Sequence, residues 1–274
     1  MPEASQVAND QVSADLVHQT SDDPVLSVVL PDKPVRLPDA VITRDTPAGR
    51  AARRCLEHFE QRVYANGIRL ELCNDFELLA AINPHLDKVP LTPQFDPKVS
   101  DISPVNGFWI KGVDNRGEII YTHAVRYDDL GTMPLATFFT SLKAFYADPG
   151  TTADPDERCI VEAPAAYTIS GRLCYQGELW IKKSSGFRGH DLAHTALQVT
   201  HALTLARWNP DYIYATINPG IAEKGVLARY GYTHAQPNGI RWNIPRTGEL
   251  LDEWLIWIPR RDLLEIIQRP FAIA

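Results

Sequence analysis

The sequence predicts an α/β fold built on a mixed, mostly antiparallel sheet, and two observations carry that prediction. In the C-terminal half, a strand, a helix, a strand and a helix are followed by two further strands, and a strand-helix-strand crossover makes its two strands parallel. In the N-terminal half, "GFWIKGV" and "EIIYTHAVRY" flank the polar turn "DNRG", which is typical of an antiparallel hairpin. We therefore expect one parallel pair near the middle of the sheet.

The composition is that of an ordinary globular protein with a sizeable core. The chain has 274 residues, of which 45% are hydrophobic and 22% charged. Its net charge of −7 provides no global positive field for phosphate backbones, so nucleic acid is not an expected partner. We find no signal-peptide core and no apolar stretch of membrane-spanning length. A cytoplasmic protein that does not contact membranes is the expectation.

The cysteines give no sign of a metal or redox site. They lie far apart without a CxxC pair, which argues against a zinc ribbon and a disulfide framework. Reduced, partly buried thiols are expected at Cys55, Cys73, Cys159 and Cys174.

The N-terminal half divides into a tail and a series of alternating elements. Residues 1–45 are rich in proline and polar residues and predict an extended or disordered tail. A helix then runs from Thr46, a possible N-cap, to Gly67. "IRLELC" predicts a strand, "NDFELLAAINPH" a short helix that ends before Pro84, and "PLATFFTSLKAFYAD" a helix with one apolar face before the loop "GTTADPDER".

The C-terminal half is the more regular one. "GELWIKK" and "DYIYATI" predict strands on either side of a helix over Asp191 to Arg207. "NPGIAEKGVLARYG" predicts a helix closed by Gly231, and "EWLIWIP" predicts the last strand. "YTHAQPNGIRWNI" between them predicts a hairpin-like stretch that turns at Pro237, Asn238 and Gly239.

The stretch "SSGFRGHDLAH", residues 184–194, connects a predicted strand to the long helix. Free N–H groups and the helix dipole at such a position hold a pyrophosphate. Gly186 and Gly189 allow close approach of the backbone, and Arg188 adds a charged donor. Asp191 repels phosphate unless it caps the helix and faces away. An ordinary capped helix that joins a strand to the core is the alternative interpretation.

A second alternative treats "HDLAH" as a metal site. His190 and His194 stand one helical turn apart, as zinc ligands do in HExxH hydrolases, but Asp191 replaces the glutamate and only His201 follows. His194, Gln198 and His201 more simply form the polar face of the helix. The zinc hydrolase is therefore the less favoured hypothesis, and no metal is expected.

The order of elements, together with this turn, resembles the GNAT superfamily of acyl-CoA-dependent N-acyltransferases. The signature of that superfamily is Arg or Gln, two residues, Gly, one residue, then Gly or Ala, between a strand and a long helix. Arg188 and Ala193 fit it here, while Asp191 stands at the first glycine. Further matches are Asn218 after the next strand and the closing pattern Tyr230, Gly231 and Tyr232. The resemblance spans residues 68–258, and its strong part runs from Gly177 to Trp242.

The resemblance implies a GNAT-like sheet with helices on both faces and a central, splayed parallel pair formed by 177–182 and 212–217. It also implies that 46–274 is a single acyltransferase-like domain with a helical insertion around 131–165. The five tryptophans of the C-terminal half are more simply core residues than ligand platforms: Trp180, Trp208, Trp242, Trp254 and Trp257.

Acetyl-CoA or another acyl-CoA is the co-substrate that the resemblance implies. It would lie in a V-shaped gap between the parallel strands, where a backbone N–H near Trp180 or Ile181 polarises the thioester carbonyl. An acceptor amine, expected to be a small molecule, would attack it directly. The implied cofactor-binding residues are Trp180, Ile181, Lys182, Arg188, Gly189, His190, Asp191, Leu192, Ala193 and Asn218.

Acid and base candidates complete the expected site. Glu178 is the candidate base, with a solvent-facing strand carboxylate as the alternative interpretation. The family's usual acid, a tyrosine, corresponds to Leu227, and Tyr230 is the candidate substitute. A catalytically inactive acyl-CoA-binding or sensor module therefore remains an alternative. The sequence leaves a homodimer open.

Overall fold

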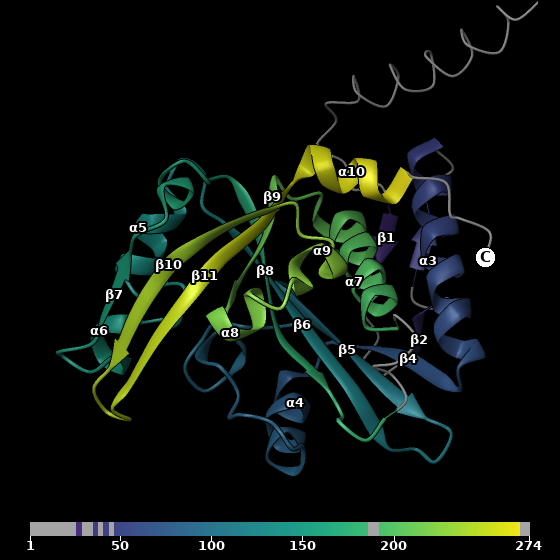
Figure 1. Cartoon of the computed structure of the whole chain (residues 1–274), viewed down its shortest axis with the longest axis horizontal. Helices are drawn as coiled ribbons and strands as arrows, with labels where there is room; N and C mark the ends of the chain where they lie inside the picture. The colour runs from purple at the N-terminus through teal and green to yellow at the C-terminus, as the bar shows by residue number, and fades with distance from the viewer. Residues whose placement is uncertain (1–25, 29–34, 38–40, 44–46, 186–191, 269–274) are drawn as a thin grey trace, which may run out of the picture.

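The structure is a computed structural model that describes residues 26–28, 35–37, 41–43, 47–185 and 192–268. In this part of the chain, nine strands form one sheet in the order β2-β4-β5-β6-β8-β9-β11-β10-β7 (Figure 1). The strands are β2 Val35–Arg36, β4 Ile68–Cys73, β5 Gly107–Asp114, β6 Ile119–Asp129, β7 Arg158–Val161, β8 Arg172–Ile181, β9 Tyr212–Ile217, β10 His234–Ile244 and β11 Glu249–Pro259.

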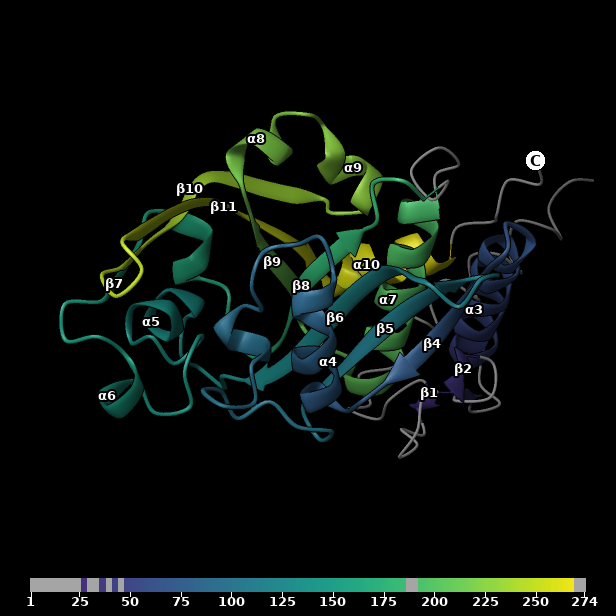
Figure 2. The same cartoon turned by 90° about the horizontal axis from the view of Figure 1, so that it is seen from below.

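The described helices pack on both faces of this sheet (Figure 2). They are α3 Pro47–Ala65, α4 Phe76–Ile82, α5 Leu135–Thr140, α6 Pro149–Thr152, α7 Leu192–Trp208, α8 Pro219–Ala222, α9 Val226–Tyr230 and α10 Arg260–Gln268. Three short 3-10 turns are η1 Asn83–His85, η2 Pro93–Phe95 and η3 Pro164–Tyr167.

The sheet confirms the predicted mixed topology. β8 and β9 pair in parallel, and the other neighbours in the sheet are antiparallel. The parallel register starts at Leu173 opposite Tyr212 and ends at Tyr175 opposite Tyr214. β8 continues to Ile181 and β9 to Ile217 without further pairing between them. The two strands therefore diverge as expected of the central pair, although their pairing precedes the predicted range 177–182 in β8.

Two apolar cores lie on opposite faces of the sheet because side chains alternate along each strand. Phe108 and Ile110 of β5 belong to the core beneath α3, α7 and α10. Trp109, between them, belongs to the core on the other face, beneath α4 and α5. Consecutive residues of one strand thus pack into different cores, one on each face of the sheet.

The helix α7 corrects one expectation about its surface. Gln198 and His201, predicted on a polar face, are buried, as are most residues of α7. The reason is that α7 lies between the sheet and α3, so little of its circumference meets solvent (Figure 1).

Three predicted elements differ in extent. α5 ends at Thr140, because Leu142 adopts a left-handed φ of 61° that an α-helix cannot accommodate. Gly225, with φ 67°, separates α8 from α9 where one helix was predicted. The region of the expected helical insertion, 131–165, contains the edge strand β7 as well as α5 and α6.

The predicted turn at Pro237, Asn238 and Gly239 is not a hairpin. It is a bulge within β10, since both flanking segments pair with β11 and the register shifts between Gln236 and Ile240. A Cβ atom at Gly239 would lie 2.2 Å from the backbone nitrogen of Leu255, so only glycine fits this close approach.

The predicted tail, residues 1–45, contributes three described strands. β1 (Leu26–Val28) and β3 (Val41–Thr43) form a two-stranded sheet, and β2 pairs with β4 at one edge of the main sheet. Among the described residues, no helix is long and apolar enough to span a bilayer.

Candidate functional site

A bulge in β8 opens the sheet beside the parallel pair. Gly177 pairs with Ala124 and Trp180 with Thr122, so Glu178 and Leu179 stand opposite the single residue His123. Glu178 has a left-handed φ of 56°, which a non-glycine residue adopts only under local constraint. The Thr122 hydroxyl donates to the Glu178 carbonyl at 2.9 Å and holds the bulge. Such a bulge bends its strand, here away from β9.

The opening is a cleft of about 630 Å³. Its walls are the β8 residues from Tyr175 to Ile181, the β9 residues from Ala215 to Ile217, and Asn218, which follows β9. Tyr230 and Leu197 line it from the α7 face, whereas Phe145 and Trp242 line it from the α5 face. The cleft therefore draws its lining from both faces of the sheet.

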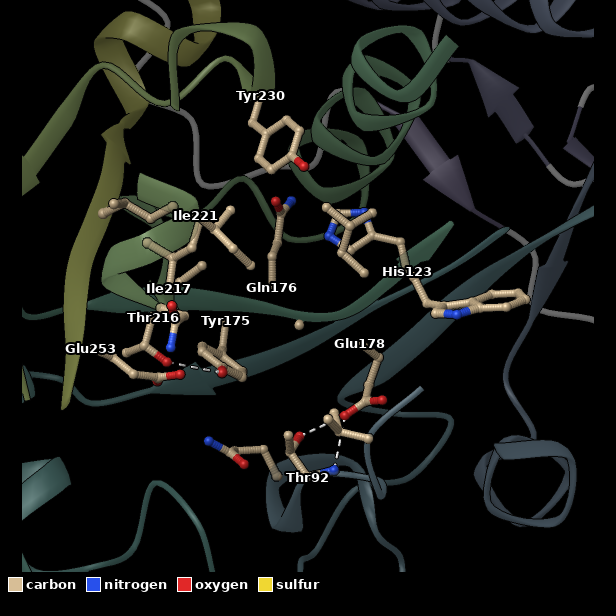
Figure 3. A pocket seen from close by; sticks show the side chains of 18 of the residues that line it. Thr92, His123, Tyr175, Gln176, Glu178, Thr216, Ile217, Ile221, Tyr230 and Glu253 are labelled. Atoms are coloured by element: carbon tan, nitrogen blue, oxygen red, sulfur yellow. Dashed lines mark hydrogen bonds between the residues drawn. The ribbon is translucent and has the colours of Figure 1, made fainter. Parts of the chain in front are cut away.

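The end of the cleft at α7 is polar and uncharged (Figure 3). His123 Nδ1 lies 3.1 Å from the Thr200 hydroxyl, which donates to the carbonyl of Ala196. Burial lowers the pKa of His123 to about 3 and keeps the ring neutral. Tyr232 donates to Gln176 Oε1 at 2.9 Å beside it.

The opposite end carries a carboxylate. Figure 3 places Glu253 of β11 beside Thr216 and Tyr175, whose hydroxyls lie 3.4 Å apart. Burial raises the pKa of Glu253, and a hydrogen bond from Thr216 lowers it in part. Burial also raises the pKa of Tyr175. Both hydroxyls are therefore neutral donors beside a poorly solvated carboxyl group.

An aromatic stack forms the wall next to Glu253. The rings of Phe145 and Trp242 lie parallel with centroids 3.8 Å apart. The buried carboxylate of Glu157 accepts from Trp242 Nε1 at 2.8 Å and from the Tyr146 hydroxyl at 2.9 Å. The indole is thereby fixed, and it offers the cleft an apolar ring rather than its N–H group.

Glu178, the predicted base, is held by three donors from the segment before η2. Lys88 Nζ lies 2.5 Å from one carboxylate oxygen, and the Thr92 amide and hydroxyl lie 2.9 and 2.8 Å from the other. The side chains of Lys88 and Glu178 are 6% and 2% exposed. The carboxylate thus differs from the solvent-facing alternative, and it ties residues 88–92 to the bulge.

The predicted cofactor-binding residues that are described lie around the wider end of β8 and β9. Trp180 and Ile181 line the cleft, and the Trp180 indole donates to the carbonyl of Asp87 at 2.8 Å. The Lys182 amide is used in the sheet, donating to Ile120. Asn218 lines the rim and caps α8 through the amide of Gly220.

The turn itself is only partly described. Leu192 and Ala193 begin α7 and contact the core beneath it. The other predicted members lie outside the described residues: Arg188, Gly189, His190 and Asp191.

The histidines of the metal hypothesis have other environments where they are described. His194 Nδ1 bonds to the carbonyl of Arg229, and His201 is buried against Tyr232 with its rings edge to face. No group of three or more His, Cys, Asp or Glu side chains suited to a metal occurs within the described ranges.

Tyr230, the candidate acid, lies in α9 with its hydroxyl directed into the cleft (Figure 3). Gly231 follows with φ 83°, and a Cβ there would lie 2.8 Å from Gln198 Nε2 of α7. Leu227, at the position of the family's usual acid, packs against the core.

Two cleft residues were missed by the sequence reasoning. Glu253 is an acid at the start of the otherwise apolar "EWLIWIP", and His123 interrupts the apolar "EIIYTHAVRY". An isolated titratable residue in a buried strand is the signal that would have indicated both.

No family model and no curated protein matches the chain. Among solved structures, Arabidopsis thaliana NAA60 with acetyl-CoA is 12% identical, with 70% of this chain and 98% of that chain covered and a TM-score of 0.42. The spermidine/spermine N-acetyltransferase SpeG from Vibrio cholerae is 11% identical, with 73% and 98% covered and a TM-score of 0.40. FeeM, an N-acyl amino acid synthase from uncultured soil microbes, is 14% identical, with 80% and 95% covered and a TM-score of 0.31.

The mixed sheet and the diverging parallel pair β8 and β9 are the features that the sequence resemblance implied. A shared fold does not by itself assign an activity.

Proposed function

We propose that the protein is an acyl-CoA-dependent N-acyltransferase that moves an acyl group, most simply acetyl, to an amine by direct attack. The observation that carries this proposal is the cleft between β8 and β9, which is lined from both faces of the sheet. Two substrates can then enter from opposite faces and meet between the strands. Direct transfer requires such a meeting point, since most of the rate gain comes from positioning.

The proposed acyl-CoA site lies on the α7 side. β9 pairs with β8 only as far as Tyr175, so the β8 edge beyond it faces the cleft and suits an extended, amide-rich ligand such as pantetheine. Trp180, Ile181 and Asn218 line the cleft. We assign the pyrophosphate to the turn before α7, including Arg188 and Gly189, on the sequence argument alone.

In the proposed reaction the amine nitrogen attacks the thioester carbonyl, the C–S bond breaks, and the thiolate takes a proton. Tyr230 is our candidate for that acid because its hydroxyl points into the cleft. Glu178 as base stays a prediction; its three donors hold the carboxylate in place and favour a positioning role.

Ligand binding and transfer are tested separately. Coenzyme A should raise the melting temperature of the full chain, because a ligand that binds only the folded state stabilises it. Arg188→Ala should weaken the binding free energy of coenzyme A by the value of one charge-assisted contact, about 1.5–3 kcal/mol. The shift in melting temperature should therefore be smaller in this variant. The matched control, Arg246→Ala, removes an exposed arginine that hydrogen bonds to Thr152 and should leave the shift unchanged.

Release of free thiol from acetyl-CoA with a panel of amines tests catalysis. Tyr230→Phe should lower kcat about 100-fold if Tyr230 is the acid. A shift in melting temperature without thiol release for any amine would favour the alternative, an acyl-CoA-binding or sensor module. No shift with coenzyme A or any acyl-CoA would overturn the proposed function.

A further inference from the structure

The end of the cleft opposite α7, where the acceptor amine would bind, contains one carboxylate, Glu253, whose charge no nearby cation balances. Among the residues that the structure describes, four charged side chains line the cleft: Lys88, Glu178, Lys183 and Glu253. Lys88 pairs with Glu178, and Lys183 pairs with Asp87 at the exposed rim, 3.5 Å away. Among the described residues, no lysine, arginine or histidine forms an ion pair with Glu253.

We propose that Glu253 binds the ammonium group of the acceptor, and that the acceptor is a primary amine on an apolar or aromatic body without a carboxylate of its own. This rests on the proposed function and deepens it by naming the acceptor class. Neither the sequence resemblance nor the likeness to other structures indicated this residue.

The position of Glu253 fits that role. β11 pairs with β9 on one side and β10 on the other, and Glu253 stands opposite Ile240. Its carboxyl group lies in the cleft with Thr216 and Tyr175 (Figure 3). Since Thr216 belongs to β9, the carboxyl group lies beside the gap where the parallel strands separate.

The unbalanced charge of Glu253 favours a cationic ligand. Glu253 is half-buried at the cleft wall, and a carboxylate that loses hydration without a compensating cation is costly. Burial raises the pKa of Glu253 accordingly. A bound ammonium would restore the missing partner. An amino acid would instead bring its own carboxylate close to Glu253, and two nearby like charges repel.

The side chains that line the cleft near Glu253 favour an acceptor whose remaining part is apolar. Phe145 and Trp242 form the stacked wall, while Ile240 and Leu251 add aliphatic surface. Glu157 occupies the indole N–H of Trp242, so this wall offers ring faces, which attract cations as well as apolar groups. Val89 and Ile221, both exposed, line the cleft too.

The proton inventory of the step balances. Glu253 takes one proton from the ammonium, and the freed amine forms the C–N bond as the C–S bond breaks. The new amide nitrogen loses a second proton, the leaving thiolate gains one, and Glu253 returns its proton to solvent. The net products are the amide, the thiol and one proton.

The test compares 2-phenylethylamine with phenylalanine, which differs by one carboxylate. In wild type, acetyl transfer to 2-phenylethylamine should exceed transfer to phenylalanine by at least about tenfold in kcat/KM. Equal rates for the two, or a preference for phenylalanine, would overturn the inference. This arm requires no variant and is therefore independent of folding defects.

Glu253→Gln should raise the KM for 2-phenylethylamine on the order of 10- to 100-fold, because a charged contact is lost. The ratio of kcat/KM for 2-phenylethylamine to that for phenylalanine should decrease in the same variant. The matched control is Asp252→Asn, an exposed acid one position earlier on β11 whose side chain points to the opposite face. An unchanged KM in Glu253→Gln, or an equal effect of Asp252→Asn, would contradict the assignment.

A binding measurement separates this inference from the proposed function. Without coenzyme A, 2-phenylethylamine should raise the melting temperature of wild type but not of Glu253→Gln. Coenzyme A should shift both equally, since Glu253 lies at the other end of the cleft. Amine binding without any response to coenzyme A would overturn the proposed acyltransferase function and support the Glu253 site. A response to coenzyme A without amine binding would support the proposed function and overturn the Glu253 site.

Discussion

The two ends of the cleft differ in charge although neighbouring residues of one strand build them. Tyr175 and Gln176 are consecutive in β8, yet Tyr175 lies with Glu253 while Gln176 bonds to Tyr232 near α7 (Figure 3). The α7 end holds neutral polar groups, and the other end holds a carboxylate between aromatic walls. The alternation of side chains along a splayed strand is thus enough to create two different binding environments.

The largest expected effect concerns the segment that borders the carboxylate end. Lys88→Met leaves Glu178 buried without its cation and should destabilise the protein by about 3–5 kcal/mol. Denaturant unfolding measures this. Lys183→Met, which breaks an exposed pair with Asp87, is the control and should cost less than about 1 kcal/mol.

The same experiment distinguishes two roles for Glu178. In the double variant Lys88→Met, Glu178→Gln, no buried charge is left alone, so the loss of stability should be smaller than the sum of the single effects. If the double variant also retains kcat, Glu178 positions residues 88–92 and is not the base. A kcat loss of 100-fold or more in a stable double variant would instead support the predicted base.

Sequence reasoning predicted the sheet better than the chemistry within it. The order of elements and the apolar periodicity were enough to predict the β8–β9 pair, because strand direction follows from local crossover rules. Pro237, Asn238 and Gly239 carry the composition of a turn, but pairing with β11 makes them a bulge. The same long-range pairing brings Glu253 to Thr216, and no local pattern encodes that contact.

The two ends of the cleft should affect the stability of the protein in opposite directions as the pH changes. Burial lowers the pKa of His123 and His201 from 6.5 to about 3. The unfolded chain then binds more protons than the folded one between those values. Stability should therefore fall as the pH drops below about 6.5, by up to about 1.4 kcal/mol per pH unit for each histidine.

Glu253 has the reverse sign, because burial raises its pKa above 4.5. Its contribution to stability is complete below pH 4.5 and is lost as the pH rises through the folded-state value. Chemical unfolding as a function of pH should show a shallower acid slope in His201→Phe, and an increased stability of Glu253→Gln at pH 7. His85→Gln, at an exposed position, should change neither. An unchanged acid slope in His201→Phe would mean that this histidine binds its proton as readily in the folded state as in the unfolded chain.

The smallest expected effect is at the α7 end, where Tyr232 anchors Gln176. Tyr232→Phe removes one neutral hydrogen bond of 2.9 Å and keeps the ring that contacts His201, with centroids 5.8 Å apart. The freed Gln176 oxygen lines the cleft, where water can replace the hydroxyl, so the loss should be about 1 kcal/mol or less in denaturant unfolding. Tyr64→Phe, at an exposed position of α3, is the control and should have no measurable effect.

A loss of stability above about 3 kcal/mol in Tyr232→Phe would show that water does not reach the α7 end of the cleft. That end would then be a closed part of the core rather than a ligand site. If the loss is small, the same variant should bind 2-phenylethylamine as wild type does, because the two ends of the cleft bind their ligands independently.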